Sequence, residues 1–367
     1  MANNTNLGAA KAAKNDEFYT QYADIQKEVN AYLEYNPDTF RDKTILLPCD
    51  DPEWSNFTRF FAQNFERLGL KRLISTSYAV ESKKYKNYQP TLFETESPLF
   101  DIDKTRIKGK IFELTRDTNG NGRIDIDDLE WHYLEGDGDF RSKEVCKLRD
   151  ESDIIVTNPP FSLFKEFVSW IFEADKKCLI IGSQGATGYK EVFPLIKENR
   201  LWLGNGFSAG NAYFGLPKEY VRDYASGVYD EKTGLVKFRN CCWLTNLEHG
   251  RRHEPLKLMT MKDNLRYGKH KDLIERGYYE RYYHYNYIDV PYTDAIPSDY
   301  ENEMGVPITY LDKHCPEQFE ILGISTFFAT VKPEGLPKSK QGGPQFYVLR
   351  DGEYVRMYNR IIIRKKQ

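Results

Sequence analysis

The segment Asp153-Ile-Ile-Val-Thr-Asn-Pro-Pro-Phe161 (DIIVTNPPF, residues 153–161) decides the fold class. Its first five residues, DIIVT, hold an apolar run rich in β-branched side chains, Ile154 to Val156, which predicts a strand buried on both faces. The two prolines end this strand. The apolar residues from Leu163 to Ile171 then recur at helical spacing, which predicts a helix capped by Ser162. A strand followed directly by a helix is typical of α/β proteins.

Strand and helix patterns alternate on both sides of this segment. We expect strands at 44–49, 72–77, 109–114 and 179–181, and helices within 15–35, 57–69 and 189–197. This alternation predicts a mainly parallel central sheet with helices on both faces. Residues 201–203 and 241–245 are expected to pair as an antiparallel hairpin at one edge, with the Gly- and aromatic-rich residues 204–237 as an inserted loop.

Composition excludes several classes of protein. Hydrophobic residues make up 40% of the chain and charged residues 29%, as in a globular enzyme. No apolar run approaches the ~20 residues needed to cross a bilayer, and the N-terminus has no apolar signal core. The six cysteines show no zinc-ligand spacing. We therefore expect a cytoplasmic protein, prokaryotic or phage-encoded, with reduced cysteines and no membrane partner.

Charge is spread unevenly along the chain, whose net charge is −3. Residues 94–153 carry 17 acidic and 10 basic side chains, whereas residues 248–281 carry 9 basic and 6 acidic ones. The tail, residues 353–367, has a net charge of +4. Any contact with a polyanion is therefore expected in the C-terminal third, and the change in composition places a domain boundary at Gly250.

The NPPF sequence, Asn158 to Phe161, follows a buried strand, and ligands bind at the carboxyl ends of parallel strands. The Asn158 amide oxygen and the Pro159 carbonyl oxygen can accept the two hydrogens of an aromatic amine such as adenine N6. Those bonds would localise the nitrogen lone pair toward a methyl donor. Pro160 fixes the backbone, and Phe161 offers a ring on which an extruded base can stack. We assign catalysis to these four residues.

Several motifs carry a family resemblance. NPPF resembles motif IV of the amino-methyltransferases that act on adenine, and Asn15–Thr20 (NDEFYT) resembles the N-terminal motif that packs against S-adenosylmethionine in such enzymes. Gly136–Phe140 (GDGDF) resembles the motif whose Asp accepts from the cofactor's adenine amino group; that residue, Asp139, precedes Asn158 by 19 residues. The resemblance to the EcoRI-type adenine methyltransferase family extends over about residues 15–365, through CDDPEWSNF (49–57), GDGDFRS (136–142), VTNPPFSLFKEF (156–167), GVPITYLDK (305–313) and PEQFEILGI (316–324).

The resemblance implies a Rossmann-like methyltransferase fold and methyl transfer from S-adenosylmethionine to adenine N6 in double-stranded DNA. Residues 1–250 would form the catalytic domain and 251–367 the DNA-recognition region. A cognate restriction endonuclease, acting separately, would be the functional partner. The implied cofactor contacts are Phe18, Tyr19, Thr20, Cys49, Asp50, Asp51, Asp139, Phe140 and Asn158. The chain departs from the usual pattern after the first strand, where Cys49–Ser55 replaces a Gly-rich loop, so whether Asp50 or Asp51 binds the cofactor stays open.

An acidic segment, residues 117–128, fits the spacing of an EF-hand calcium loop. The candidate ligands of a structural calcium ion are Asp117, Asn119, Asn121, Asp125 and Asp128. The same residues also suit a Gly/Asn turn with solvated acids, because Asp stands at the last position instead of the commoner Glu and no clear helix pair flanks the loop. Both interpretations stay open at this point.

Residues 266–287 interleave seven tyrosines with basic side chains, a pattern typical of nucleic-acid contact. The candidate DNA contacts are Arg251, Arg252, Arg266, Lys269, Arg276 and Arg281. A solvated face over core tyrosines would give the same pattern. Two other functions remain as alternatives for the whole chain: an N6-adenine RNA or protein-glutamine methyltransferase, and a non-catalytic, calcium-dependent binding module built on residues 117–128.

Overall fold

The computed structural model describes residues 19–49, 55–79, 97–207, 211–215, 228–336 and 345–366. The chain divides into two compact units: the first comprises Met1–Ser183 and Leu203–His249, the second Gln184–Trp202 and Gly250–Gln367. The second unit is discontinuous in sequence, because Gln184–Trp202 groups with the residues from Gly250 onward. Among the described residues, no helix is long and apolar enough to span a membrane.

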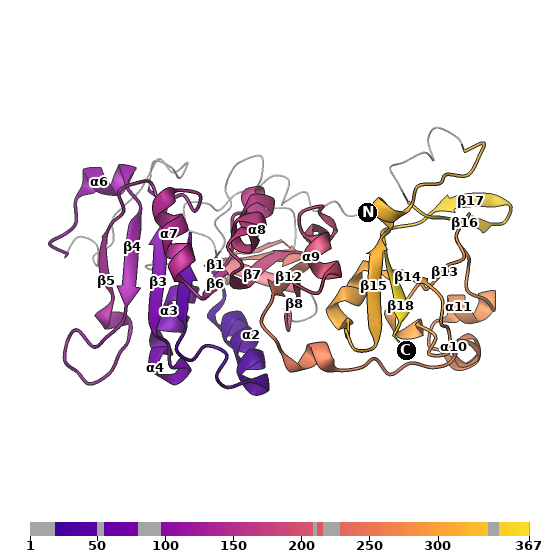
Figure 1. The fold of residues 1–367 in the computed structure, drawn as a ribbon, viewed down its shortest axis with the longest axis horizontal. Coiled ribbons are helices and arrows are strands. Elements are labelled where there is room, and N and C mark those ends of the chain that lie inside the picture. The colour runs from indigo at the N-terminus through magenta and orange to yellow at the C-terminus, as the bar shows by residue number, and fades with distance from the viewer. Residues whose placement is uncertain are drawn as a thin grey trace. The chain divides into compact units, whose positions relative to one another are not determined.

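The first unit is built on an eight-stranded sheet in the order β5-β4-β3-β2-β6-β7-β12-β8 (Figure 1). Its strands are β2 (Thr44–Leu47), β3 (Arg72–Ser77), β4 (Lys110–Leu114), β5 (Glu130–Tyr133), β6 (Ile154–Thr157), β7 (Lys177–Ser183), β8 (Trp202–Leu203) and β12 (Cys241–Thr245). The four strands β3, β2, β6 and β7 are parallel. Because β4, β5 and β12 pair antiparallel, the sheet is mixed.

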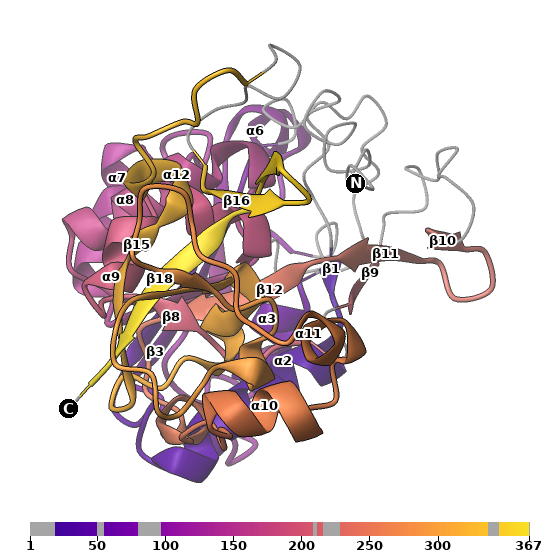
Figure 2. The same cartoon turned by 90° about the vertical axis from the view of Figure 1, so that its right-hand side faces the viewer.

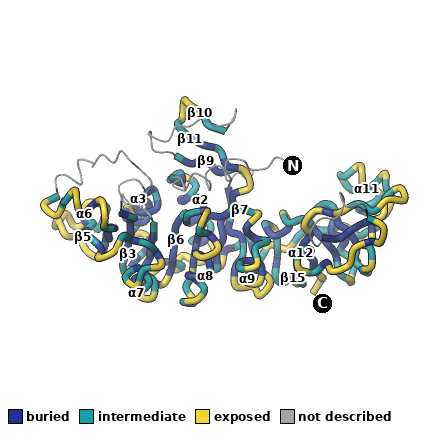
Figure 3. The backbone as a smooth tube through the Cα atoms, turned by 90° about the horizontal axis from the view of Figure 1, so that it is seen from above, coloured by how far each residue is buried: buried dark blue, intermediate teal, exposed yellow. Residues whose placement is uncertain are grey.

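Helices cover both faces of this sheet. They are α2 (Tyr22–Tyr35), α3 (Asn56–Gln63), α4 (Phe65–Leu68), α6 (Ile102–Ile107), α7 (Lys143–Glu151) and α8 (Phe164–Glu173). Figure 3 shows α2 and α3 on one side of the buried strands and α7 and α8 on the other. In β2, Ile45 and Leu47 belong to the core cluster that holds Val29 of α2 and Phe61 of α3, while Leu46 between them is also fully buried. Both faces of β2 are therefore buried, as its continuous apolar sequence predicts.

Local signals set several helix ends. The hydroxyl of Ser55 accepts from the backbone N–H groups of Phe57 and Thr58 and so caps α3. Gly69 ends α4 in a left-handed conformation, at φ 63°. The expected cap by Ser162 is wrong: a 3₁₀ turn at Phe161–Leu163 precedes α8, whose N-cap is Leu163, without a side-chain cap bond.

The segment expected as an inserted loop, residues 204–237, contributes strands instead. A second sheet has the order β1-β9-β11-β10, with β1 (Tyr19–Thr20), β9 (Asn211–Gly215), β10 (Tyr229–Asp230) and β11 (Leu235–Arg239). Figure 2 shows β9 and β11 beside β1, with β10 at the outer end of this sheet. Ala212, Phe214, Val236 and Phe238 alternate with more exposed neighbours and join the core of the first unit, so the sequence period of two was present but masked by flanking glycines.

The second unit contains a four-stranded sheet in the order β13-β14-β18-β15 and a separate hairpin, β16-β17. Its strands are β13 (Ile288–Asp289), β14 (Met304–Pro307), β15 (Phe319–Ile324), β16 (Tyr347–Arg350), β17 (Glu353–Arg356) and β18 (Arg360–Lys365). Its helices are α9 (Phe193–Lys197), α10 (Met261–Tyr267), α11 (Lys271–Arg276) and α12 (Ser325–Phe328). The central strand β18 contributes the fully buried residues Ile361, Ile362 and Ile363, which explains the apolar stretch within an otherwise basic tail.

Candidate active site

Asn158 and Pro159 follow β6, between the neighbouring parallel strands β2 and β7. The hydroxyl of Thr157, the last residue of β6, donates a 2.9 Å hydrogen bond to the carbonyl oxygen of Pro48, just beyond β2. This bond fixes the two strand ends side by side. Asn158 is half-buried and its side-chain oxygen is shielded from solvent. The amide thus lies at the carboxyl edge of the sheet, where ligands of α/β proteins bind.

Phe161 is more deeply buried than a base-stacking role would require. Only 6% of the residue is exposed, and its ring packs 6.3 Å from that of Phe238 on β11. Phe161 also belongs to the main core cluster. In this structure the ring therefore packs in the core of the first unit. Stacking of the ring on an extruded base would require local rearrangement. Sequence reasoning missed Phe238, whose contribution depends on the pairing of distant strands.

The chain turns sharply after β2. Cys49 adopts a left-handed backbone at φ 66°, which is uncommon for a residue other than Gly, Asn or Asp. It stands where related folds carry a Gly-rich loop, and strained backbone of this kind is concentrated at functional sites. Asp50 and Asp51, the two candidate cofactor acids, lie outside the described residues.

Tyr78, directly after β3, lies beside this turn. Its pKa is raised above the ordinary value, first by burial and then by the neighbouring Cys49 and Asp139. Its hydroxyl also accepts a long, 3.4 Å hydrogen bond from the backbone N–H of Phe140. Tyr78 therefore joins the ends of β2 and β3 to the GDGDF loop. The sequence signal that could have identified Tyr78 as a site residue is its position directly after a predicted strand.

The GDGDF loop packs against the end of β3 through glycine backbone. A Cβ atom on Gly138, at φ 84°, would lie 2.2 Å from the carbonyl oxygen of Ser77, and one on Gly109 would lie 2.5 Å from the same atom. The backbone N–H of Ala79 donates to the carbonyl of Asp137 at 2.8 Å. Only glycine permits this close approach, which holds the loop at the carboxyl edge of the sheet.

Asp139 is half-buried, and both its carboxylate oxygens accept from the Arg141 side chain, at 2.9 and 2.7 Å. Burial alone would raise the pKa of Asp139, but the hydrogen bonds and positive charge of Arg141 outweigh it and lower the pKa. The carboxylate is therefore ionised and oriented. Arg141 also bonds Glu166 of α8, at 2.8 Å. Sequence reasoning missed this arginine, although it stands two residues from Asp139.

Phe140 is packed in the core. It is fully buried, with its ring 5.1 Å from that of Phe167 and 5.5 Å from that of Trp170. These contacts account for the ring without a ligand, and the cofactor contact of Phe140 stays a prediction. The residue anchors the GDGDF loop to α8, the helix that follows NPPF.

The N-terminal motif is described only from Tyr19, so Phe18 lies outside the described residues. Tyr19 and Thr20 form β1, which pairs antiparallel with β9. The carbonyl oxygen of Thr20 accepts from Asn56 Nδ2 at 2.7 Å. Because Asn56 begins α3, the helix that follows the turn at Cys49, this bond places β1 beside the start of that helix.

The acidic loop gathers no metal ligands. Within the described ranges, no three His, Cys, Asp or Glu side chains lie close enough together to hold a metal ion. The loop oxygens instead accept backbone N–H groups: Asp117 from Gly120 and Gly122, Asn119 from Asn121, and Asn121 from Arg123. Asp125 and Asp128 form a reciprocal capping box. The arrangement is that of a turn, and it gives no support to a calcium site or to a calcium-dependent binding module.

The candidate DNA contacts all lie in the second unit, but their environments differ. Arg252 is only 5% exposed, with its guanidinium 3.5 Å from the centre of the Trp202 ring and bonded to Asn199. Its assignment as a phosphate contact is therefore wrong in this structure, because the charge is covered by an aromatic ring. Arg251 is partly exposed and pairs with Asp312 at 2.5 Å.

The remaining candidate cations are more accessible. Arg266 and Arg281 are exposed, and Lys269, with 75% of its side chain exposed, pairs with Asp294. Arg276 is partly buried against Glu280. The tyrosines divide: Tyr279 and Tyr282 belong to the core, whereas Tyr267 and Tyr278 are 74% and 56% exposed. The basic, tyrosine-rich pattern therefore contains both core and surface residues.

Comparisons with known proteins identify the family of the chain. The family described as adenine-specific methyltransferase EcoRI matches residues 6–366. The chain is 41% identical to the type II methyltransferase M.EcoRI of Escherichia coli, over 88% of this chain and 89% of that one. It is 32% identical to M.MpnI of Mycoplasma pneumoniae, over 98% and 97% of the two chains, and 31% identical to M.MgeORF184P of Mycoplasma genitalium, over 98% of each. No solved structure matches. The chain therefore belongs to the EcoRI family of adenine-specific methyltransferases.

Proposed function

We propose that this protein transfers a methyl group from S-adenosylmethionine to N6 of an adenine extruded from a specific sequence in double-stranded DNA. The observation that carries the proposal is the position of Asn158 and Pro159 at the carboxyl end of β6, on the sheet edge where Cys49, Tyr78 and Asp139 converge. Membership of an adenine-specific family supplies the class of reaction.

The chemistry follows from the electronic structure of adenine. The N6 lone pair is delocalised into the ring, so the free amine is a poor nucleophile. The Asn158 amide oxygen and the Pro159 carbonyl would accept the two N6 hydrogens and direct the lone pair toward the donor. As the new N–C bond forms, the S–CH₃ bond of the sulfonium breaks and N6 loses one proton to solvent. Neither oxygen is basic enough to hold that proton.

The residues at the sheet edge fit an adenosine-bearing methyl donor. Asp139 presents an ionised carboxylate that Arg141 holds in place, and it would accept from the donor's adenine amino group. Thr20 and Tyr19 lie beside the start of α3, where they would pack against the bound donor. When bound, S-adenosylmethionine supplies the electrophilic methyl group; every other element of the proposed reaction comes from the chain.

We assign DNA recognition to residues 251–367, and phosphate contact to the exposed cations Arg266, Lys269 and Arg281. Their support is the basic charge of this region in a chain of net charge −3. We also propose the modification half of a restriction–modification pair, with the endonuclease acting separately in a bacterial cytoplasm. Three bacterial relatives are named type II methyltransferases. Protection of host DNA from a cognate endonuclease would test this role.

The decisive variant is Asn158→Ala, assayed by transfer of a labelled methyl group to DNA. Loss of one preorganised polar group should lower kcat by at least ~10²-fold, while S-adenosylmethionine binding stays measurable by calorimetry. Asn246→Ala is the matched control. This half-buried asparagine accepts from Cys178 at the opposite end of β7, so its loss should leave kcat within a few-fold. Equal activities of the two variants would reject the assignment.

A further inference from the structure

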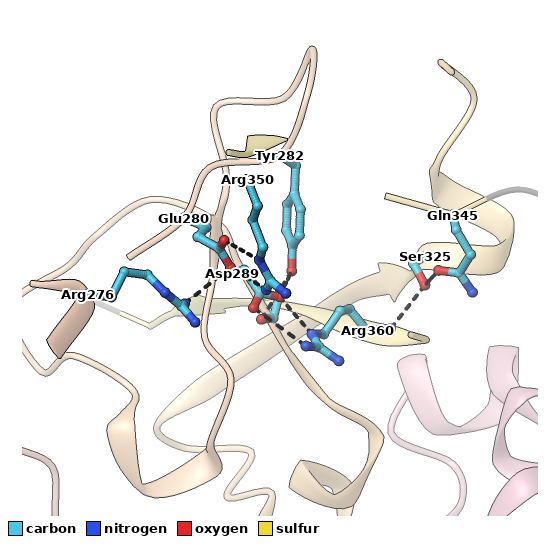
Figure 4. Close-up of polar contacts among 9 residues, drawn as sticks. Arg276, Glu280, Tyr282, Asp289, Ser325, Gln345, Arg350 and Arg360 are labelled. Carbon is cyan, nitrogen blue, oxygen red and sulfur yellow. Dashed lines mark hydrogen bonds and ion pairs between the residues drawn. The ribbon is translucent and has the colours of Figure 1, made fainter. Parts of the chain in front are cut away.

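Glu280 is a buried carboxylate that two arginines share (Figure 4). Only 3% of its side chain is exposed. Arg350 donates from Nε and Nη2 to its two oxygens, at 2.5 and 2.6 Å, and Arg276 donates from Nη1 at 3.2 Å. One carboxylate thus fixes the direction of two guanidinium groups from different elements.

The two arginines lie at the ends of their elements. Arg276 is the last residue of α11, before the left-handed Gly277, and Arg350 is the last residue of β16, before the turn at Asp351–Gly352. Their side chains remain 22% and 39% exposed. Arg350 therefore bonds Glu280 through one edge of its guanidinium and Arg276 through a single N–H, while both side chains remain partly exposed.

The second buried carboxylate of the cluster, Asp289, has its own cation: Arg360 donates to it at 2.7 Å, and the Tyr282 hydroxyl adds a bond of 2.6 Å. Asp289 and Arg360 are nearly inaccessible, with 1% and 10% of their side chains exposed. The more accessible cations of the cluster are therefore Arg276 and Arg350, and Glu353 lies opposite Arg350 in the β16–β17 hairpin.

A guanidinium held this way suits bases better than phosphates. Phosphate contact tolerates a flexible cation, which the exposed Lys269 already provides. Bidentate recognition of a base edge needs a planar donor fork at a fixed angle, and guanine O6 and N7 are its commonest partners in the major groove. A buried carboxylate that holds the guanidinium of Arg350 by two hydrogen bonds provides that fixed angle.

We propose that Arg350, with Arg276 beside it, reads a guanine edge in the recognised DNA sequence, and that Glu280 is the positioning residue for both. This inference rests on the proposed function, since it assumes that residues 251–367 meet the duplex. It adds a specificity-determining residue, Arg350, from a hairpin more than 60 residues beyond the tyrosine-rich segment.

The test compares two probes by fluorescence anisotropy. One duplex carries the motif that sequencing of modified adenines defines in DNA from an expressing host, and the other carries the same bases scrambled. Arg350→Lys keeps the charge and removes the fork. It should lower the ratio of the two affinities about 10-fold or more, leave the salt dependence on scrambled DNA unchanged, and let methylation spread to sites that differ at one base pair. Arg276→Lys should do the same more weakly.

Arg364→Lys is the matched control, because Arg364 also bonds two carboxylates, Glu303 and Glu320, at 3.5 and 3.1 Å, but neither of these carboxylates is buried as Glu280 is. It should leave the affinity ratio unchanged. Glu280→Gln removes a negative charge yet should also lower the ratio, whereas a simple electrostatic contact would then bind both duplexes more tightly. Thermal unfolding establishes that each variant is folded.

Two results would overturn the inference. An unchanged ratio in Arg350→Lys and Arg276→Lys would make the cluster purely structural, and an equal loss on both duplexes in Arg350→Ala with an unchanged ratio would make it a phosphate contact. Failure of the proposed function looks different. The wild-type protein would then leave no modified adenines in the host and would bind neither duplex.

Discussion

The hydroxyl of Thr157 is bonded to the carbonyl oxygen of Pro48 across 109 residues of sequence. Both groups lie at the carboxyl ends of their strands, one residue before Asn158 and one before Cys49. The bond therefore joins the turn that carries the proposed catalytic amide to the turn beside the proposed cofactor site. Because the Thr157 side chain is fully buried, water cannot replace it.

Thr157→Val should weaken both stability and activity. The substitution preserves shape but leaves a buried carbonyl without its donor, which should cost about 1–3 kcal/mol of unfolding free energy in urea. Misplacement of Asn158 should also lower kcat. The control is Thr245→Val, since Thr245 makes the same kind of buried bond, 2.7 Å long, to the carbonyl of Cys178 at the amino end of β7. Thr245→Val should lose a comparable amount of stability and keep a normal kcat. If both variants had the same kcat, the Thr157–Pro48 bond would have no role in positioning Asn158.

Asp139→Ala should weaken S-adenosylmethionine binding by roughly 1–3 kcal/mol, because the donor's amino group loses its acceptor. Isothermal calorimetry measures the change. Arg141→Ala provides the comparison, since it removes the guanidinium and leaves the carboxylate that it holds. That variant should retain most of the affinity. Unchanged binding in Asp139→Ala would show that GDGDF is only a structural turn.

Variants of Arg252 and Arg266 should distinguish an arginine that stabilises the fold from one that contacts DNA. Arg252→Ala removes the stack on Trp202 and should lower the unfolding free energy by about 2 kcal/mol, with no change in the salt dependence of DNA binding. Replacement of Arg266 and Arg281 together by Ala should instead reduce the slope of log affinity against log salt by up to about two units. A flattened slope in Arg252→Ala would contradict its buried position.

His314 should make stability depend on pH. Burial first, and then the nearby charges of Arg252 and Lys366, lower its pKa from 6.5 to about 4. The unfolded chain takes up a proton near pH 6.5 and the folded chain does not, so stability is greatest above that pH and falls as pH decreases toward 4. The loss should amount to about 3 kcal/mol. Urea unfolding between pH 7 and 4.5 should show a shallower decline in His314→Gln, and parallel curves would exclude this residue as the cause.

Much of the local structure could be predicted from the sequence. The limits of β3, Arg72–Ser77, are those of the predicted strand, and the left-handed cap at Gly69 ends α4 where the pattern indicates. The position of NPPF at the end of a buried strand was predicted from nine consecutive residues. These features depend on side-chain period and turn chemistry, which neighbouring residues determine.

Other properties depend on residues that are distant in sequence. The strands β4 and β12 run antiparallel to their neighbours β3 and β7, which makes the sheet mixed. Their direction depends on the path of the chain between the strands, which the local pattern of each strand does not contain. Phe161 is buried because Phe238 arrives from a different sheet, and Arg252 is buried because Trp202 lies beneath it. Composition cannot distinguish a cation stacked on a ring from one that faces solvent.

The chemistry that we propose could therefore be inferred from a short stretch of sequence, since the Asn158 amide and the Pro159 carbonyl are adjacent in the chain. Which cations remain exposed depends on the fold instead. Arg276 and Arg350 are 74 residues apart, yet one buried carboxylate orients both. A carboxylate desolvated by folding requires partners, and the fold alone determines which arginines can reach it.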